Sequence, residues 1–330
     1  MGNGRLTEVR LEELRDRLGC DVAAIPGNVL VLGREGEGRP WIVHRAPQLV
    51  PEITERRLRH LLRFLDVHLR DQLPPAFWTL ATMADGWRER RGVSPTFTWV
   101  QPEPEKMGDE WWGGPGEVPR LSPTRPGVVC FAAHRGDPSA VLVPEGHFLA
   151  DGYRHLFLRT RLADGPWHRK QPVALFAGRD HGDATNVPGL AAANSRRFLA
   201  ERVAAEGLDV EVHLGQPISR RRQLRAKYLI DTDGLARTWD SWAWKMASRS
   251  LLVAVDSAWD TYFSGRFEPS VHYVPVARDL SDLREQLAWC RAHEEDCHRI
   301  AAAGADRAGE VYTWSAAAAG TAEVLARHLG

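Results

Sequence analysis

The segment 227–240, with the sequence KYLIDTDGLARTWD, carries the residue types best suited to binding an anion. Its first half predicts an apolar strand and its second half the start of a helix. Ligands of parallel sheets bind beyond the carboxyl ends of the strands, where the free N–H groups of a helix N-terminus favour phosphate. Gly234 permits close backbone approach, and Arg237 and Thr238 add a charge and a hydroxyl. These features predict a diphosphate site. The alternative is an ordinary strand–helix turn with Thr238 or Asp240 as N-cap.

Two other groups of residues have the composition of metal ligands. Asp231-Thr232-Asp233 spells an Asp-x-Asp pattern, but alternate strand residues point to opposite faces and converge on a metal only through a turn. His293 and Cys297, four residues apart between Cys290 and His298, have the spacing of two zinc ligands on one helix face. Nothing elsewhere completes that set, and we predict no metal site.

Asp85 is the strongest candidate for a general base. It follows an apolar strand predicted at 77–83 and precedes Gly86, a position typical of active-site carboxylates in α/β folds. A turn-forming Asp-Gly pair is the alternative. The chain has no Gly-x-Ser-x-Gly, Walker, His-Glu-x-x-His or Gly-x-Gly-x-x-Gly motif, which argues against the common hydrolase, NTPase, metalloprotease and dinucleotide-binding classes.

Two basic runs stand out, one on a helix predicted at 52–70 and one at Arg220-Arg221-Arg222 with Arg225. The first comprises Arg56, Arg57, Arg59, Arg63 and Arg70. Either run suits an anionic acceptor or an acidic lipid, and a solvated face with local ion pairs is the alternative. We expect at most peripheral membrane contact, through the helix 52–70.

The composition narrows the class of protein. The 330 residues hold 43 Lys and Arg against 43 Asp and Glu, and a zero net charge argues against a nucleic-acid partner. The start of the chain lacks the apolar region of a signal peptide, and four cysteines make no disulfide framework. These features predict a cytoplasmic enzyme. The 13 tryptophans suit either a flat surface for a ring-shaped ligand or an aromatic core.

The hydrophobic pattern predicts an α/β protein with two halves and a cleft between them. In the second half, strands alternate with helices, which indicates a parallel sheet with crossover helices. We expect a first domain at 1–165, rejoined by the last helix at 310–330, and a second domain at 166–309. The expected strands are 29–31, 77–83, 96–100, 128–132, 140–143, 173–176, 209–213, 228–231, 251–255 and 272–276. The expected helices are 8–18, 52–70, 195–205, 220–226, 238–247 and three after 279.

Several segments, taken in order, resemble one family, the glycosyltransferases of the CAP10 or protein O-glucosyltransferase type (family 90). The strongest resemblance lies in KYLIDTDG, TWDSWAWKMASRSLLVAVDS and VHYVPVARDLSDL. Upstream, LFAGRDHG resembles the Phe-x-Gly phosphate-side loop of the family, DEWWGGP its Trp-Gly-Gly-Pro loop, and FWTLATMADG the strand that ends in its catalytic base. The Trp-rich helix is most similar to that of bacterial members.

The resemblance implies a GT-B fold, in which two Rossmann-like domains face each other. It also implies an inverting, metal-independent transfer from a UDP-sugar, usually of glucose or xylose, with Asp85 as general base. The implied donor-binding residues are Gly178, Arg179, Asp233, Gly234, Arg237, Thr238, Trp239, Lys245, Asp256 and His272. The implied sugar or acceptor pocket comprises Trp87, Trp111, Trp112 and Gly113.

Three positions depart from the family pattern. An arginine before the loop glycine is Ala177 here, an arginine of the following helix is replaced near Asp240, and an acidic residue is missing near Thr261. The alternative function is therefore an inactive protein that binds a nucleotide-sugar or saccharide. For an active enzyme, a glycan, a lipid-linked saccharide and a small molecule all remain open as acceptor, and the oligomeric state stays open too.

Overall fold

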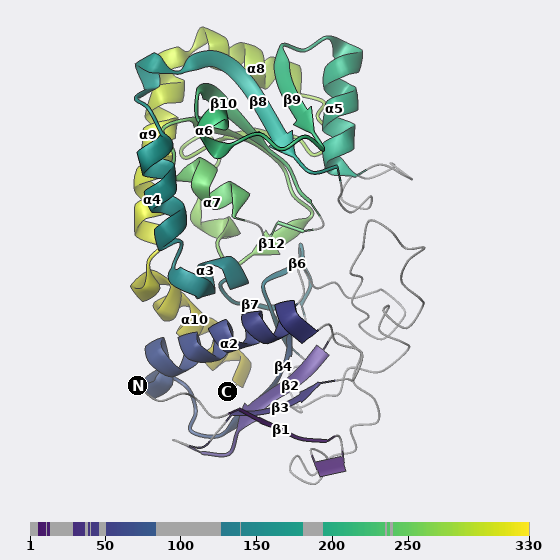
Figure 1. Cartoon of the computed structure of the whole chain (residues 1–330), viewed down its shortest axis with the longest axis vertical. Coiled ribbons are helices and arrows are strands. Elements are labelled where there is room, and N and C mark those ends of the chain that lie inside the picture. The colour runs from purple at the N-terminus through teal and green to yellow at the C-terminus, as the bar shows by residue number, and fades with distance from the viewer. Residues whose placement is uncertain are drawn as a thin grey trace. The chain divides into compact units, whose positions relative to one another are not determined.

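The chain folds into two compact units, which are described separately. In the computed structural model the described residues are 6–10, 12–13, 29–36, 39, 41–45, 51–83, 127–138, 140–180, 194–234, 236–237 and 240–329. The first unit comprises residues 1–150 and 314–330, and the second comprises residues 151–313 (Figure 1). The boundary thus precedes the one expected at 165. Each unit contains a sheet with helices, as the domains of a GT-B fold do, and the predicted α/β class is confirmed.

The first unit is built on a six-stranded mixed sheet of order β1-β3-β2-β4-β5-β7, in which β2 runs antiparallel to both neighbours. Leu6–Glu8 forms a strand, so the helix expected at 8–18 does not begin at Glu8. All five leucines of the segment predicted as the helix 52–70 are buried and form its apolar face. The elements are β1 (Leu6–Glu8), β2 (Val29–Arg34), β3 (Trp41–Arg45), α2 (Pro51–His68), β4 (Phe77–Thr82), β5 (Val128–Cys130), β6 (Ala132–His134), β7 (Ala140–Leu142), α3 (Gly146–Asp151) and α10 (Trp314–Leu329).

The second unit is built on a five-stranded, all-parallel sheet of order β13-β11-β10-β8-β9. Its elements are α4 (Arg154–Ala163), β8 (Gln171–Gly178), α5 (Ser195–Glu206), β9 (Val210–Leu214), α6 (Arg220–Gln223), β10 (Ala226–Asp231), α7 (Ser241–Met246), β11 (Leu251–Val255), β12 (Trp259–Thr261), β13 (Val274–Val276), α8 (Leu283–Ala292) and α9 (Glu294–Val311). The parallel sheet predicted for this half is confirmed.

Successive residues of the central strands pack into two different cores. Phe176 and Ile230 lie in a core with α5, α8 and α9 on one face of the sheet. Their chain neighbours Leu175 and Leu229 lie in a second core with Trp244 of α7 on the other face. Side chains of a strand alternate between faces, so in a parallel sheet covered on both sides every residue of a central strand is buried, as in β10 and β11.

Helix α4 explains why the boundary between the units precedes residue 165. Leu156 and Ala163 of α4 pack against the second core of the parallel sheet. Just after the helix, the buried Asp164 pairs with Lys170, and its Oδ2 accepts a hydrogen bond from the backbone N–H of Arg249 (2.7 Å). The segment around residue 165, where the domain boundary was expected, is therefore part of the second unit.

Two predicted helices differ from the observed ones. The helix expected at 220–226 ends at Gln223, because the chain enters β10 at Ala226. The helix expected from Thr238 begins only at Ser241. None of the helices in the described part of the chain has the length and apolar character needed to cross a membrane.

Two glycines of α9 allow a matched test of the packing under the parallel sheet. A Cβ on Gly304 would lie 2.5 Å from the carbonyl oxygen of His272 and 2.9 Å from Met246 Sδ, whereas one on Gly309 would meet no atom within 4 Å. We expect Gly304→Ala to lower the free energy of unfolding by about 1–3 kcal/mol. Gly309→Ala should raise it by up to about 1 kcal/mol through helix propensity. Urea unfolding measures both, and equal effects would contradict this packing.

Candidate functional site

The carboxyl ends of the parallel strands bring four segments of the second unit to one edge. Strand β8 ends at Gly178, β10 at Asp231, β11 at Val255 and β13 at Val276. Numbered within this unit, the sheet order is 2-1-3-4-5, and the direction of winding reverses between β8 and β10. In doubly wound sheets, ligands bind in the crevice beyond the strands at such a switch point. The edge beside Gly178 and Asp231 is therefore the candidate site.

Strand β10 ends in a buried ion pair. Lys245 Nζ of α7 donates to Asp231 Oδ1 (2.6 Å) and to the carbonyl oxygen of Ile230 (3.0 Å), and Ser241 Oγ also donates to Asp231 Oδ1 (2.5 Å). Burial by itself acts to raise the pKa of Asp231, but the charges of Lys245 and Arg237 and these hydrogen bonds hold it below its usual value. Lys245, implied as a donor-binding cation, is 3% exposed here and is engaged with Asp231.

The second aspartate is also engaged. Arg237 Nε donates to Asp233 Oδ1 (2.8 Å), and Ser257 Oγ donates to Asp233 Oδ2 (2.7 Å). Arg237 also donates to the carbonyl oxygen of Val255 (2.6 Å), and its guanidinium lies over the ring of Trp242 (4.9 Å to the centroid). Both carboxylates of the Asp-x-Asp pattern therefore accept hydrogen bonds from protein cations and hydroxyls. Arg237, the predicted diphosphate ligand, orders the turn after β10 in this structure.

Arg196 of α5 is the cation that the motif analysis missed. A Cβ on Gly234 would lie 2.7 Å from its Nη2, so the absence of a side chain at Gly234 makes room for the guanidinium. Arg196 Nη1 donates to the carbonyl oxygen of the predicted Arg179 (3.2 Å), and a Cβ on the predicted Gly178 would approach Arg196 Cδ to 3.4 Å. Burial lowers the pKa of Arg196, and the nearby Asp231 and Asp233 oppose that effect. The sequence Asn194-Ser195-Arg196, at the start of the predicted helix 195–205, could have identified Arg196 as a cation at a helix N-terminus.

A small, shallow pocket lies beside Asp233 at the same edge. Its lining includes Ser195, the predicted Asp256, and Arg278, which follows β13. Arg278 donates to Asp256 Oδ2 (2.9 Å) and to the carbonyl oxygen of Ser257 (2.6 Å). The buried Ser195 Oγ and Arg278 Nε have no hydrogen-bond partner in the described structure. Buried polar atoms are normally satisfied, so these two atoms are candidate hydrogen-bonding partners for a ligand.

The N-terminus of helix α5, which follows β8, lies at this edge. Helix α5 begins at Ser195, and the side chain of its N-cap residue, Asn194, accepts a hydrogen bond from the backbone N–H of Arg197. Thr238 and Trp239 lie outside the described residues, as does Leu235. The positive end of the α5 dipole therefore adds to the charges of Arg196 and Arg278.

One predicted donor residue lies elsewhere. His272 precedes β13, which begins at Val274, whereas the candidate edge follows Val276, so His272 lies at the opposite end of that strand. Its Nδ1 accepts a hydrogen bond from the backbone N–H of Glu268 (2.9 Å). The predicted general base, Asp85, lies outside the described residues and remains a prediction. The same holds for the predicted sugar or acceptor pocket of Trp87, Trp111, Trp112 and Gly113.

The candidate zinc ligands point into different surroundings. Cys290 and Cys297 are buried thiols, and Cys297 Sγ donates to the carbonyl oxygen of Cys290 (3.4 Å). His293 stacks on Trp289, whereas His298 stacks on Trp167. Packing thus accounts for all four side chains.

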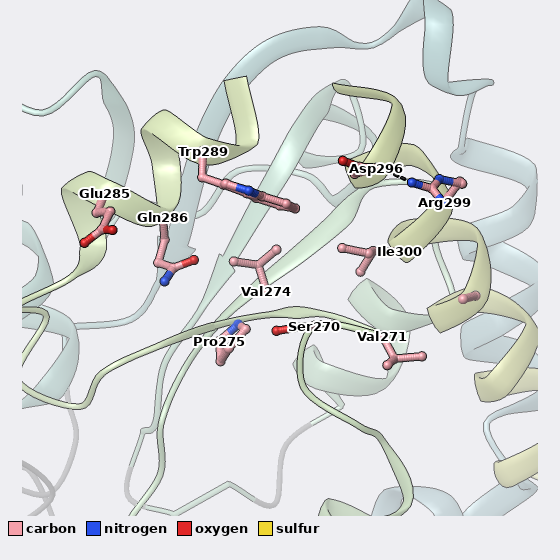
Figure 2. Close-up of a pocket in the computed structure, with 11 residues that line it drawn as sticks. Ser270, Val271, Val274, Pro275, Glu285, Gln286, Trp289, Asp296, Arg299 and Ile300 are labelled. Carbon is pink, nitrogen blue, oxygen red and sulfur yellow. Dashed lines mark hydrogen bonds and ion pairs between the residues drawn. The ribbon is translucent and has the colours of Figure 1, made fainter. Parts of the chain in front are cut away.

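A wider pocket lies along the edge strand β13 and contains none of the predicted site residues. Figure 2 shows the ring of Trp289 from α8 on one side of this pocket, with Val274 of β13 and Ile300 of α9 opposite and beside it. Asp296 and Arg299 form an ion pair at its rim. Two buried polar atoms without a hydrogen-bond partner in the described structure, Ser195 Oγ and Arg278 Nε, belong to residues that line the smaller pocket, so we place the candidate site there.

The second unit is thus a doubly wound α/β domain with a polar pocket at the carboxyl edge of its sheet. Residues 155–311, nearly the whole of this unit, match the model of glycosyl transferase family 90. This match confirms the resemblance found in the sequence.

The chain is similar to several known proteins. It is 36% identical to protein O-glucosyltransferase 2 of Danio rerio, over 42% of this chain and 29% of that protein. It is 29% identical to protein O-glucosyltransferase 1 of Rattus norvegicus, over 49% of this chain and 43% of that protein. The matches thus span less than half the length of these relatives. A crystal structure of Anabaena HepE in complex with UDP-glucose aligns with a TM-score of 0.32 and 14% identity, over 53% of this chain and 45% of that one.

The buried pair at the end of β10 generates a stability prediction. Asp231→Asn leaves the Lys245 charge buried without a counter-charge, and we expect a loss of about 3–5 kcal/mol in the free energy of unfolding at pH 7. Adding Lys245→Met should recover most of that loss. Asp209→Asn is the matched control, because its exposed carboxylate pairs with Arg291 at the surface and should contribute at most about 1 kcal/mol.

The same pair has a pH dependence of defined sign. The folded-state pKa of Asp231 is held low, so its stabilisation is fully present above the ordinary carboxyl pKa of about 4 and is lost as pH falls through the folded value. The stability difference between wild type and Asp231→Asn should therefore stay constant from pH 7 to about pH 5 and shrink in acid. A difference that grows in acid would contradict this ion pair.

Proposed function

We propose that the protein is an inverting glycosyltransferase that moves a sugar from a UDP-sugar donor to an acceptor hydroxyl. The match of residues 155–311 to the model of glycosyl transferase family 90 supports the reaction class. The names of the O-glucosyltransferase relatives favour a glucosyl donor, with xylosyl as the second choice. The acceptor class is a glycan, a lipid-linked saccharide or a small molecule. The buried free thiols Cys130, Cys290 and Cys297 suit a reducing compartment, and we propose a cytoplasmic location.

The observation that carries the proposal is the incomplete hydrogen bonding at the switch point. Ser195 Oγ and Arg278 Nε are buried donors without a partner among the described residues. They lie at the edge where the α5 N-terminus and the Arg196 guanidinium also lie. A nucleoside diphosphate carries the acceptor oxygens and negative charge that would satisfy this set.

These groups have a defined role in the transfer. When the acceptor oxygen attacks the anomeric carbon, the bond from that carbon to the UDP oxygen breaks and negative charge develops on the diphosphate. We assign Arg196, Arg278 and the α5 N-terminus to stabilise that charge, which would make a bound metal unnecessary. Arg196 would then compensate for the two family arginines that this chain lacks, at Ala177 and near Asp240.

The proton of the acceptor hydroxyl needs a base on the opposite face of the sugar. We assign Asp85, whose carboxylate would take that proton as the new glycosidic bond forms. Attack from the face opposite the departing UDP inverts the anomeric configuration. Trp87, Trp111, Trp112 and Gly113 are proposed to line the sugar or acceptor pocket.

Donor binding tests the assignment of Arg196. We expect UDP to raise the melting temperature of the wild type, with no effect of EDTA, because bound ligand stabilises the folded state. Arg196→Gln should weaken UDP binding at least tenfold in calorimetry, since a charge-assisted contact to phosphate is lost. Arg197→Gln is the matched control: its neighbouring guanidinium pairs with Asp180 and is half-exposed. Equal weakening by both variants would contradict the assignment.

Turnover tests the base and separates an enzyme from an inactive binding protein. We expect Asp85→Asn to lower the rate of sugar transfer at least a hundredfold and to leave the Kd for UDP unchanged, because the base contributes only to the chemical step. Full activity of this variant would refute the role of Asp85. UDP-sugar binding by the wild type without transfer to any acceptor class would favour the inactive nucleotide-sugar-binding protein instead.

A further inference from the structure

Helix α4 of the second unit exposes two leucines on its outer face. Leu158 is 53% exposed and Leu162 is 78% exposed. They are four residues apart, so they lie one above the other on the same side of the helix. The opposite side, with Leu156 and Ala163, is used in packing against the parallel sheet. The exposed leucines therefore contribute nothing to the core, and their exposure has a cost in water.

The rest of the outer face of α4 is basic. With about 3.6 residues per turn, Arg154 and Arg161 flank the leucines on one side and His155 and Arg159 flank them on the other. The helix contains no acidic residue. In the described structure the three arginines have no ion-pair partner, and the nearby acids are engaged elsewhere: Asp151 with His155, and Asp164 with Lys170.

Helix α6 extends this basic surface. It packs beside α4 and contributes three consecutive arginines. Arg220 pairs with Asp240 and Arg222 with Glu211, while Arg221 is exposed and has no ion-pair partner among the described residues. Arg159 is close enough to Arg220 for their like charges to repel. Figure 1 labels both helices in the second unit. The α4–α6 surface, as we call it, comprises Leu158, Leu162, Arg154, Arg159, Arg161 and Arg221.

We propose that the α4–α6 surface binds the headgroup region of an anionic lipid membrane. Arginines around a central apolar pair match a surface that is negative outside and apolar a few ångströms deeper, and such faces lie in the plane of the interface. Nucleic-acid phosphate would pair with the arginines but would leave the leucines in water. The proposal is independent of the transferase activity.

The surface also differs from helix α2, the helix for which the sequence predicted peripheral membrane contact. On α2, Arg59 is paired with Glu55, and Val67 is its only strongly exposed large apolar side chain within the described residues. The α4 face has two such side chains one turn apart, with unpaired arginines around them. This contrast makes α4, and not α2, the proposed membrane contact.

Vesicle binding by the full chain tests the proposal. We expect sedimentation with phosphatidylcholine vesicles that contain 30% phosphatidylglycerol, and little with pure phosphatidylcholine. Binding should weaken from 0.1 M to 0.5 M NaCl, because salt screens the arginines. Leu158→Ser with Leu162→Ser should reduce the partition coefficient at least tenfold. Arg154→Gln with Arg161→Gln should reduce it by about fivefold per arginine.

The matched controls lie on α2. Val67→Ser and the pair Arg56→Gln with Arg63→Gln make the same kinds of change at exposed positions outside the α4–α6 surface, and we expect both to bind vesicles as the wild type does. Unchanged melting temperatures of all variants would show that folding is not the cause. Loss of binding by the α2 variants alone would overturn the proposal. Absence of vesicle binding by the wild type would also overturn it. So would binding to a polyanion that the arginine variant weakens and the leucine variant does not.

Discussion

The second unit depends on how strand β10 ends. A central parallel strand is buried on both faces, yet this one closes with two aspartates that are each less than 5% exposed. Burying a carboxylate costs free energy unless it is paired and hydrogen-bonded. Lys245 and Ser241 donate hydrogen bonds to Asp231, and Arg237 and Ser257 donate to Asp233. These partners come from α7, the turn before it and the segment after β11. The two buried charges therefore fix the connections that follow two neighbouring strands.

This arrangement has a consequence for the candidate site. Lys245 and Arg237 are engaged inside the protein, so a bound anion must meet other cations. Arg196 comes from α5 and Arg278 from the segment after β13. Both lie at the carboxyl edge, one on each side of β10 and β11 in the sheet order. The site thus combines two kinds of cation: those that neutralise the aspartates and order the edge, and those that remain beside a pocket with unsatisfied donors.

The two sides of helix α4 face different surroundings, a protein core and solvent. Its inner side completes the core beneath the parallel sheet, together with the pair formed by Asp164 and Lys170. Its outer side leaves Leu158 and Leu162 in solvent among arginines. A helix that only covered a sheet would carry polar residues on that outer side. Packing explains the inner side of α4, and the proposed membrane contact would explain the apolar residues on its outer side.

The sequence by itself determined the elements with strong local signals. Strand β11 has the predicted bounds, 251–255, because its apolar run is bordered by polar residues, and α5 begins at the predicted Ser195 for the same reason. The Asp-Thr-Asp-Gly turn was located correctly after β10. Tertiary structure alone decided that Arg237 and Lys245 face aspartates, that Arg196 lies against Gly234, and that α4 belongs to the second unit. Local patterns fix helix and strand, but the partner of a buried charge depends on which distant segments the sheet order brings together.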